Sequence, residues 1–292
     1  MNRFTALVIL IHAGLLSLAG CGQDATSPNA PDDAQSKVTS NRDEAGDSQQ
    51  SELSVATARA VGRVQGTIAI QTLPATLPPV VRQGQAVRDA ATCAATEVPD
   101  ESLIVSPNGG LKNVFVYLKT KPAGYQRRDA PKSEIVFDQR GCRFVPHVML
   151  ISTGQTLRVL NADPISHNTR TLTLNNPPLN RVNPPQDRTG FTMQFEHSER
   201  VPILVTCDLH PWMRAYHLVI DHTFAATTDA AGVFSIEELP VGEHQFRVWQ
   251  ERAGFLERSL KVTVEANQTT DIQLTYQSDR FDLPVAVEES KS

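Results

Sequence analysis

The chain has 292 residues, with 32 acidic and 27 basic side chains and a formal net charge of −5. Residues 22–60 carry seven acidic and three basic side chains, residues 277–292 carry four and two, and residues 61–276 are neutral overall. Nucleic-acid binding requires a basic stripe, which a neutral body does not provide. The composition therefore excludes a nucleic-acid-binding protein.

The N-terminus is typical of a secretory signal. A charge at Arg3 precedes an apolar run over 4–18 that is too short to span a bilayer, and Leu18-Ala19-Gly20-Cys21 follows. Small residues directly before a Cys resemble the lipobox of bacterial lipoproteins, which implies that Cys21 is acylated and that residues 1–21 are the signal peptide. An ordinary signal peptide that happens to contain a Cys is the alternative. Gly22 and Gln23 follow, with no Asp at the second mature position. By resemblance to lipoprotein sorting in Gram-negative bacteria, this implies a lipid anchor in the outer membrane, with the protein facing the periplasm.

The segments next to the two ends are predicted to be disordered. Residues 22–60 contain no aromatic side chain and are rich in Ser, Asp, Asn, Gln, Ala and Pro, so they bury too little apolar surface to offset the entropy of ordering. We interpret them as a tether and residues 277–292 as a disordered tail.

The body between these segments is predicted to be all-β. Short β-branched or aromatic runs alternate with Gly, Pro, Asn or Asp, which favours Greek-key sandwiches or barrels. No amphipathic pattern of three helical turns is present. The predicted strands are 64–70, 113–118, 134–137, 156–160, 192–195, 201–206, 216–220, 233–236, 245–249, 259–264 and 270–276.

The loop from Cys207 to Met213 brings together side chains that suit a copper ion. Cys207 ends a strand-like run, His210 and Met213 follow it closely, and Pro211 stiffens the loop by fixing φ. His167, forty residues before Cys207, adds a second imidazole. A blue-copper centre has two His and one Cys in a plane with a weak axial Met, where soft sulfur favours Cu(I) and imidazole tolerates Cu(II). We therefore predict a single type 1 copper site with these four ligands.

The same residues carry a family resemblance. The pattern Cys-x-x-His-Pro-aromatic-Met at 207–213, with Asn-x-x-x-x-x-His-Asn at 161–168, resembles the cupredoxins, and the short loop is most similar to the amicyanin and plastocyanin branch. The resemblance implies that His167, Cys207 and His210 are equatorial ligands and Met213 the axial one. It also implies that Asn168 ties the two ligand loops together by hydrogen bonds.

Several assignments around this site have alternatives. Zinc accepts the same Cys and His ligands but has no use for the thioether, and Met213 is alternatively a core gap-filler. In cupredoxins the loop His has an exposed edge in an apolar patch, so Trp212 either helps form a docking patch for a redox partner or packs the loop onto the barrel. His147 is a candidate for a second or alternative site. Residues 170–190 are predicted to be an irregular excursion.

The other two cysteines are expected to pair. With Cys21 taken by lipid and Cys207 by the metal, Cys93 and Cys142 remain, and two leftover thiols in the periplasm usually form a disulfide. The alternative is that one of them is the metal ligand and Cys207 belongs to a disulfide, but neither has a His and a Met two or three residues downstream.

A second module follows the copper loop. Residues 223–276 alternate strands with turns at Asp229-Ala230-Ala231-Gly232 and Pro240-Val241-Gly242, and they resemble the carboxypeptidase-regulatory, transthyretin-like β-sandwich. Because 54 residues are few for such a sandwich, residues 61–70 either complete it or belong to the cupredoxin-like domain, which we place at 61–222. In the first case the copper domain is an insertion.

These features predict a membrane-tethered periplasmic copper protein that transfers single electrons to or from a redox protein partner and is not an enzyme. The alternatives are a copper buffering or delivery protein, and a cell-surface binding module with a cupredoxin fold and no working metal.

Overall fold

The computed structural model describes residues 60–72, 76–126 and 129–283. The predicted signal peptide, the predicted acylation site Cys21 and nearly all of the predicted 22–60 tether lie outside these residues. Within the described part of the chain, no helix is long and apolar enough to cross a bilayer. The fold is all-β, as predicted, and its strands form two sandwiches with separate cores.

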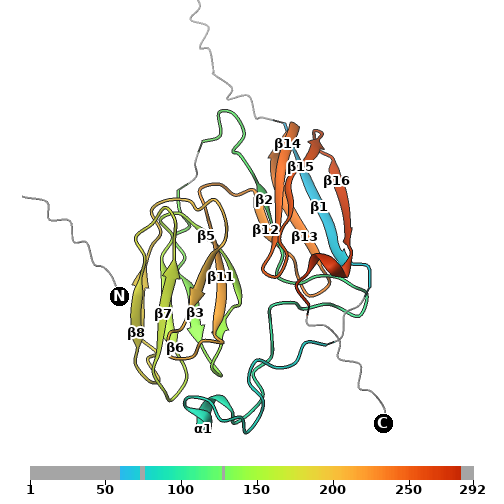
Figure 1. Ribbon diagram of the computed structural model, residues 1–292. Coiled ribbons are helices and arrows are strands. Elements are labelled where there is room, and N and C mark those ends of the chain that lie inside the picture. Colours follow the sequence, from blue (N-terminus) through green and yellow to red (C-terminus); the bar gives the residue numbers. More distant parts are fainter. Residues whose placement is uncertain (1–59, 73–75, 127–128, 284–292) are drawn as a thin grey trace, which may run out of the picture. The chain divides into compact units, whose positions relative to one another are not determined.

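The first sandwich, called here the flanking sandwich, takes strands from both ends of the described chain. A three-stranded sheet has the order β13-β1-β16 and a four-stranded sheet the order β12-β2-β14-β15. Figure 1 shows β1, in blue, between β13 and β16. The strands are β1 (Val61–Ile70), β2 (Phe115–Leu118), β12 (Ala225–Thr227), β13 (Val233–Pro240), β14 (Gly242–Gln250), β15 (Gly254–Val264) and β16 (Thr269–Tyr276).

Strand β1 is the middle strand of its sheet, between β13 and β16. Its side chains alternate between the core and the surface, and its backbone packs closely against β16. Val64, Ile68 and Ile70 point into the core with Phe246 and Val262, the period-2 pattern of a strand with one buried face. Gly66 is required at its position, since a Cβ there would lie 2.0 Å from the Ile272 carbonyl oxygen on β16.

The second sandwich, called the inserted sandwich, lies in the chain between β2 and β12. Its sheets have the orders β5-β11-β10-β7-β8 and β4-β3-β6-β9, and its core includes Phe137, Phe144, Ile151, Val159 and Val205. The strands are β3 (Ile135–Gln139), β4 (Phe144–Val145), β5 (Val148–Ser152), β6 (Leu157–Asn161), β7 (His167–Leu172), β8 (Asn180–Asn183), β9 (Phe191–Met193), β10 (Ile203–Thr206) and β11 (Arg214–Ile220).

Three sequence-based boundaries differ from the structure. The range 61–222 is too wide for one domain, because β1 and β2 belong to sheets of the flanking sandwich. For residues 61–70 this confirms the alternative that they complete the C-terminal module. The excursion at 170–190 is not irregular throughout, because β8 pairs with β7 along its whole length. The tail at 277–292 begins in ordered chain, with a 3-10 turn at Ser278–Arg280 and Phe281 buried in the core of the flanking sandwich.

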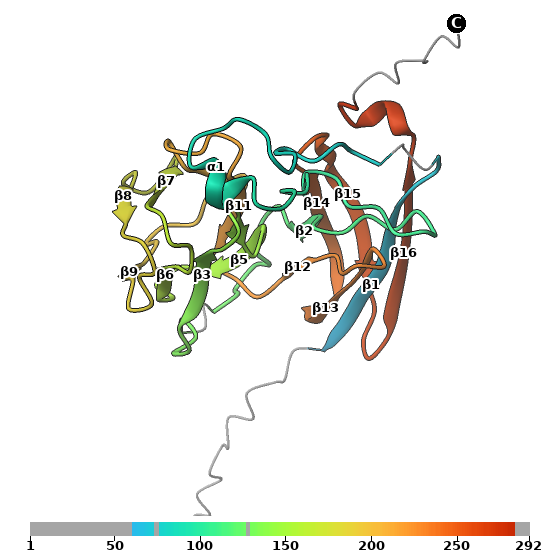
Figure 2. The ribbon, with the colours of Figure 1, turned by 90° about the horizontal axis from the view of Figure 1, so that it is seen from below.

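A segment before β2, residues Val81–Val98, covers one end of the inserted sandwich, and we call it the cap. Val81 and Val98 pair as an isolated β-bridge that closes its base, and both side chains are buried in the core of the inserted sandwich. The cap contains helix α1 (Ala90–Cys93), and Figure 2 shows α1 over that end of the sandwich, near β11. The disulfide between Cys93 and Cys142, which the sequence predicted, holds the cap in place.

A third apolar cluster joins side chains from both sandwiches. Phe115 and Tyr117 of β2 and Trp249 of β14 lie with Leu218 and Ile220 of β11.

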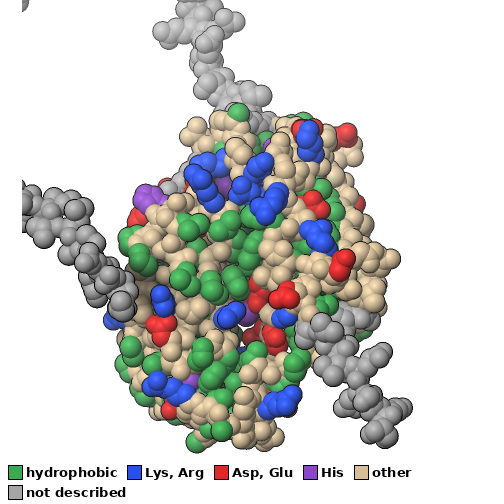
Figure 3. Space-filling model, in the orientation of Figure 1, with side chains coloured by type: hydrophobic (Ala, Val, Ile, Leu, Met, Phe, Trp, Pro, Cys, Tyr) green, Lys and Arg blue, Asp and Glu red, His purple; other side chains and the backbone are tan. Residues whose placement is uncertain are grey.

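The face shown in Figure 3 carries acidic and basic side chains together with hydrophobic ones.

The buried imidazole of His217 has no hydrogen-bond partner among the described residues, and this makes the stability of the fold depend on pH. His217 on β11 is fully buried against the Phe137 ring, and neither ring nitrogen has a hydrogen-bond partner among the described residues. Burial lowers the pKa of His217 from 6.5 to about 3. The unfolded chain therefore takes up a proton as the pH falls below 6.5, which the folded chain resists, so stability is lost progressively from there toward pH 3.

We expect this histidine to account for about 2 kcal/mol of lost stability between pH 7.5 and pH 5. His217→Leu should remove that part of the pH dependence, as measured by urea unfolding of the metal-free chain at the two pH values. The exposed His197→Leu is the matched control and should retain it. If His217→Leu and the wild type lose the same stability over this interval, the interpretation of His217 is wrong.

Candidate metal centre

The loop between β10 and β11 presents three of the predicted ligands. The two strands form an antiparallel pair, so residues 207–213 make a short connection between them. The Met213 N–H donates to the His210 carbonyl at 2.9 Å, and the Cys207 N–H donates to the Met213 carbonyl at 3.4 Å. The side chains of all three residues are buried, with relative exposures of 1% or less.

The fourth predicted ligand reaches the same place from β7. His167 is the first residue of β7, which pairs antiparallel with β10, so the start of one strand meets the end of the other. The donor atoms of His167, Cys207 and His210 all lie within 4.8 Å of one another. The structure therefore brings the His167 imidazole together with the Cys207 thiol, 40 residues later in the sequence, and with the His210 imidazole, 43 residues later.

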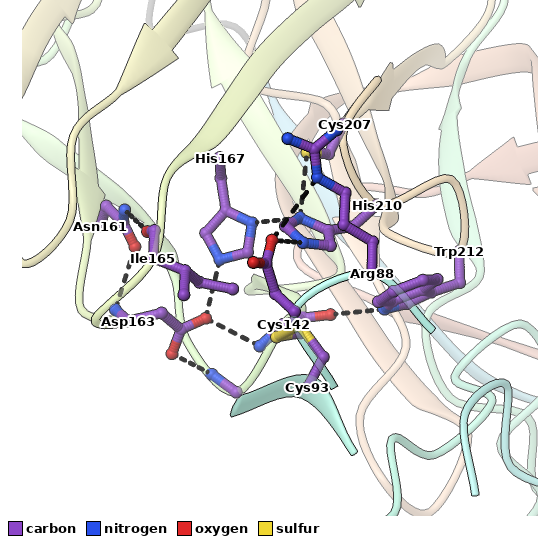
Figure 4. Close-up of a disulfide and its surroundings, with 12 residues drawn as sticks. Arg88, Cys93, Cys142, Asn161, Asp163, Ile165, His167, Cys207, His210 and Trp212 are labelled. Carbon is purple, nitrogen blue, oxygen red and sulfur yellow. Dashed lines mark hydrogen bonds and ion pairs between the residues drawn. A yellow bond between two sulfur atoms is a disulfide. The ribbon is translucent and has the colours of Figure 1, made fainter. Parts of the chain in front are cut away.

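Both imidazole rings are held with the same nitrogen facing inward. Nε2 of His167 lies 2.9 Å from a carboxylate oxygen of Asp163, and Nε2 of His210 lies 3.0 Å from one of Asp89. The two Nδ1 atoms face each other at 2.9 Å, and Nδ1 of His210 is 3.7 Å from the Cys207 sulfur. Figure 4 shows the rings facing each other, with Asp163 on the outer side of His167.

Asn168 connects the two ligand-bearing segments. Its side-chain oxygen accepts the Asp208 N–H at 2.7 Å, and its side-chain amide donates to the Asp208 carboxylate at 3.1 Å. Its backbone N–H lies 3.4 Å from the Cys207 sulfur as a donor. These are the contacts between loops that the resemblance implied for Asn168.

Hydrogen bonds shift the charge states in the site. Burial alone would raise the pKa of the Cys207 thiol, but bonds from His167, His210 and backbone N–H groups lower it to about 6. Burial likewise opposes the charged forms of His167 and Asp163, yet their mutual hydrogen bond raises the pKa of His167 and lowers that of Asp163. Cys207 is therefore a thiolate at neutral pH, the form that binds metals.

This arrangement of donors calls for a cation. In the metal-free protein a proton lies between the Nδ1 atoms and the thiolate. Once that proton leaves, each Nε2–H still donates to a carboxylate, and two Nδ1 lone pairs converge with the thiolate in a buried space. Such a group of acceptors is unfavourable unless a proton or a metal ion lies among them. Two imidazoles and one thiolate are the equatorial donors of a blue-copper centre, so the residues present fit copper.

The other predicted residues lie near or away from this centre. Met213 is buried in the same core cluster as Cys207. Trp212 is half-buried, its indole N–H donates to the Cys142 carbonyl at 3.2 Å, and its ring lies 5.2 Å from that of His210. His147 does not join the metal group, because its Nε2 contacts the Glu251 carboxylate.

The expected exposed edge of His210 is absent. The imidazole has no exposed surface, because the cap supplies the Asp89 carboxylate on the side where the resemblance implied solvent. Trp212 contacts the disulfide-bonded segment rather than forming an open patch with His210. A docking surface at this edge would require the cap to move.

Two carboxylates that hold the rings were not identified from the sequence. Asp163 lies four residues before His167, in the block that carries the resemblance, so its proximity was a usable signal. Asp89 lies 121 residues before His210, and nothing in the local pattern links them. A second group with metal-ligand geometry, formed by Cys142, Asp163 and His167, offers no free thiol because Cys142 is in the disulfide.

No model of a known protein family matches this chain, and no curated protein matches it either. Three of the solved structures to which it is similar contain a cupredoxin or a copper enzyme. The copper-containing nitrite reductase NirK of Thermus scotoductus SA-01 is 18% identical over 35% of this chain, with a TM-score of 0.27. That match spans only 26% of the reductase.

Amicyanin of Paracoccus versutus is 17% identical over 32% of this chain and 86% of its own, with a TM-score of 0.27. A purple cupredoxin of Nitrosopumilus maritimus is 19% identical over 30% of this chain and 99% of its own, with a TM-score of 0.25. Part of this chain is thus similar to cupredoxins.

Proposed function

We propose that this chain is a type 1 copper protein that transfers single electrons. His167, Cys207 and His210 would hold the ion, and Met213, buried in the same core cluster, would add a thioether. The observation that carries the proposal is the convergence of one thiolate and two inward-facing Nδ1 atoms within 4.8 Å. Copper bound by such donors supplies a reversible one-electron change.

The chain's own residues favour electron transfer over the alternatives. The ligands lie at the start of β7 and in the loop that joins β10 to β11, and they are fixed by Asn168, Asp163 and Asp89. These contacts limit how far the ligands would move when copper changes its oxidation state. Each ligand side chain is at most 1% exposed. A buried, closed set of ligands leaves no open position for a substrate and no path for handing the ion to another protein, so neither catalysis nor delivery fits as well.

A copper titration of the full chain tests this function. We expect one equivalent of Cu(II) to produce a thiolate charge-transfer band in the visible, which a reductant bleaches and an oxidant restores over repeated cycles. A colourless protein that binds copper only as Cu(I) would instead indicate buffering or delivery. Failure to bind copper stoichiometrically, or a strong preference for zinc, would contradict the proposal.

We also propose that Cys21 anchors the chain in a bacterial outer membrane, facing the periplasm, where a redox protein would be its partner. The proposal is supported by the sequence Leu18-Ala19-Gly20-Cys21 after an apolar run. Cells fed an alkyne-labelled fatty acid should label the wild-type chain, and Cys21→Ala should abolish the label and release the protein from membranes. Equal labelling of both chains would contradict it.

A further inference from the structure

We infer that Asp89, in the cap, is a positioning residue for the copper centre. Its carboxylate holds the Nε2 side of the His210 ring in place and shields that edge of the ring from solvent. This inference rests on the proposed function. It concerns a residue far from the ligand loop in sequence, on a segment that belongs to neither sheet of the inserted sandwich.

The contact between Asp89 and His210 joins a partly exposed carboxylate to a fully buried ring. Asp89 Oδ2 lies 3.0 Å from His210 Nε2, and their side chains are 37% and 0% exposed. An exposed ion pair contributes little, but here the acceptor satisfies a ring nitrogen that would otherwise be buried by the cap with no partner. The bond therefore fixes both the orientation of the imidazole and which nitrogen carries the hydrogen.

The cap holds Asp89 in place through its backbone. Asp89 adopts a left-handed conformation with φ 54° and ψ 38°, which Asp tolerates better than most residues. Its carbonyl accepts the N–H groups of Thr92 and Cys93. Because Cys93 is bonded to Cys142, the turn that carries Asp89 is covalently attached to the inserted sandwich.

The same disulfide also supports the carboxylate on the other ring. The N–H groups of Gly141 and Cys142 donate to Asp163 at 2.6 and 2.8 Å, and Asp163 holds His167. Figure 4 shows Asp163 and the Cys93–Cys142 bond beside the two imidazoles. The Cys93–Cys142 disulfide therefore supports both the Asp163–His167 pair and the Asp89–His210 pair. Of the two carboxylates, Asp89 is the one that lies in the cap.

This geometry has two consequences for the ion. A carboxylate that accepts the Nε2–H makes the imidazole a more basic ligand, which favours the more highly charged oxidised ion and lowers the reduction potential. The cap also covers the ring edge, so small anions in solution do not reach the ion past His210.

The test compares Asp89→Ala, Asp89→Asn and Asp89→Glu in the full copper-loaded chain. Loss of such a partner typically costs ten- to a hundredfold in metal affinity. If the lost affinity is that for Cu(II), Asp89→Ala should raise the reduction potential by about 59 mV for each tenfold loss of affinity. The nearly isosteric Asp89→Asn should give a smaller rise, and Asp89→Glu should restore most of the wild-type value.

Glu97→Gln is the matched control, because it removes one exposed carboxylate from the same cap without touching a ligand. Its potential should stay near that of the wild type. A second readout uses the metal-free chain: the Nε2–H of His210 should exchange slowly with solvent in nuclear magnetic resonance spectra of the wild type and quickly in Asp89→Ala. Added azide should change the visible spectrum of Asp89→Ala and leave the wild type unchanged.

The outcomes separate this inference from the proposed function. A wild type with no thiolate–copper band overturns the function itself. A coloured wild type whose potential, azide response and His210 exchange are the same in Asp89→Ala overturns only the role of Asp89. Equal shifts in Glu97→Gln and Asp89→Ala would assign the effect to general charge loss and would also overturn it.

Discussion

Cys207→Ser is expected to abolish the visible charge-transfer band of the copper-loaded chain completely. The band requires a thiolate, and hydrogen bonds in the folded protein already hold the Cys207 pKa at about 6. A serine hydroxyl stays protonated at neutral pH and is a hard donor that does not match Cu(I). Absorption spectra recorded during copper titration measure the effect.

Met213→Leu is the control for this variant. It removes only the proposed thioether donor and should keep the band, with a changed reduction potential. Cys207 is the free cysteine of the described residues, so a band that survives in Cys207→Ser would have to come from another thiolate, and the assignment of the ligands would be wrong.

Replacing both Cys93 and Cys142 by Ser should lower the free energy of unfolding by about 4 kcal/mol, as the chain-entropy relation gives for a sequence separation of 49. The denaturant midpoint of the metal-free chain should fall accordingly. The same double variant loosens the turn that carries Asp89, so the reduction potential should rise in the same direction as in Asp89→Ala.

The wild type under reducing conditions provides a comparison for the disulfide variant, since both lack the covalent link. Loss of less than about 1 kcal/mol in the double variant would mean that the link does not restrict the unfolded chain as the model of loop closure requires. An unchanged potential would mean that Asp89 keeps its position without the disulfide.

Much of the candidate centre could be predicted because its signals are local. Cys207, His210 and Met213 lie within one loop after a strand, and a second imidazole with its neighbouring Asn168 begins another strand. Antiparallel pairing of β7 and β10 then brings the two ends together. The disulfide followed from counting thiols under the expectation of an oxidising compartment.

The rest depends on contacts that sequence patterns do not encode. Asp89 meets His210 only because the cap folds over the end of the sandwich, 121 residues away in sequence. Strand β8 was missed because its four residues are mostly polar and exposed, so no hydrophobic alternation marks it. Short β2 joined the wrong predicted domain because its partner β14 lies far along the chain.

The most direct test of the central claim is copper X-ray absorption spectroscopy of the full chain loaded with one equivalent of the metal. We predict one short copper–sulfur distance and two copper–nitrogen distances from imidazole, with the sulfur lost in Cys207→Ser and one nitrogen lost in His167→Ala. A spectrum with only oxygen and nitrogen neighbours in the wild type would contradict the shared coordination of His167, Cys207 and His210.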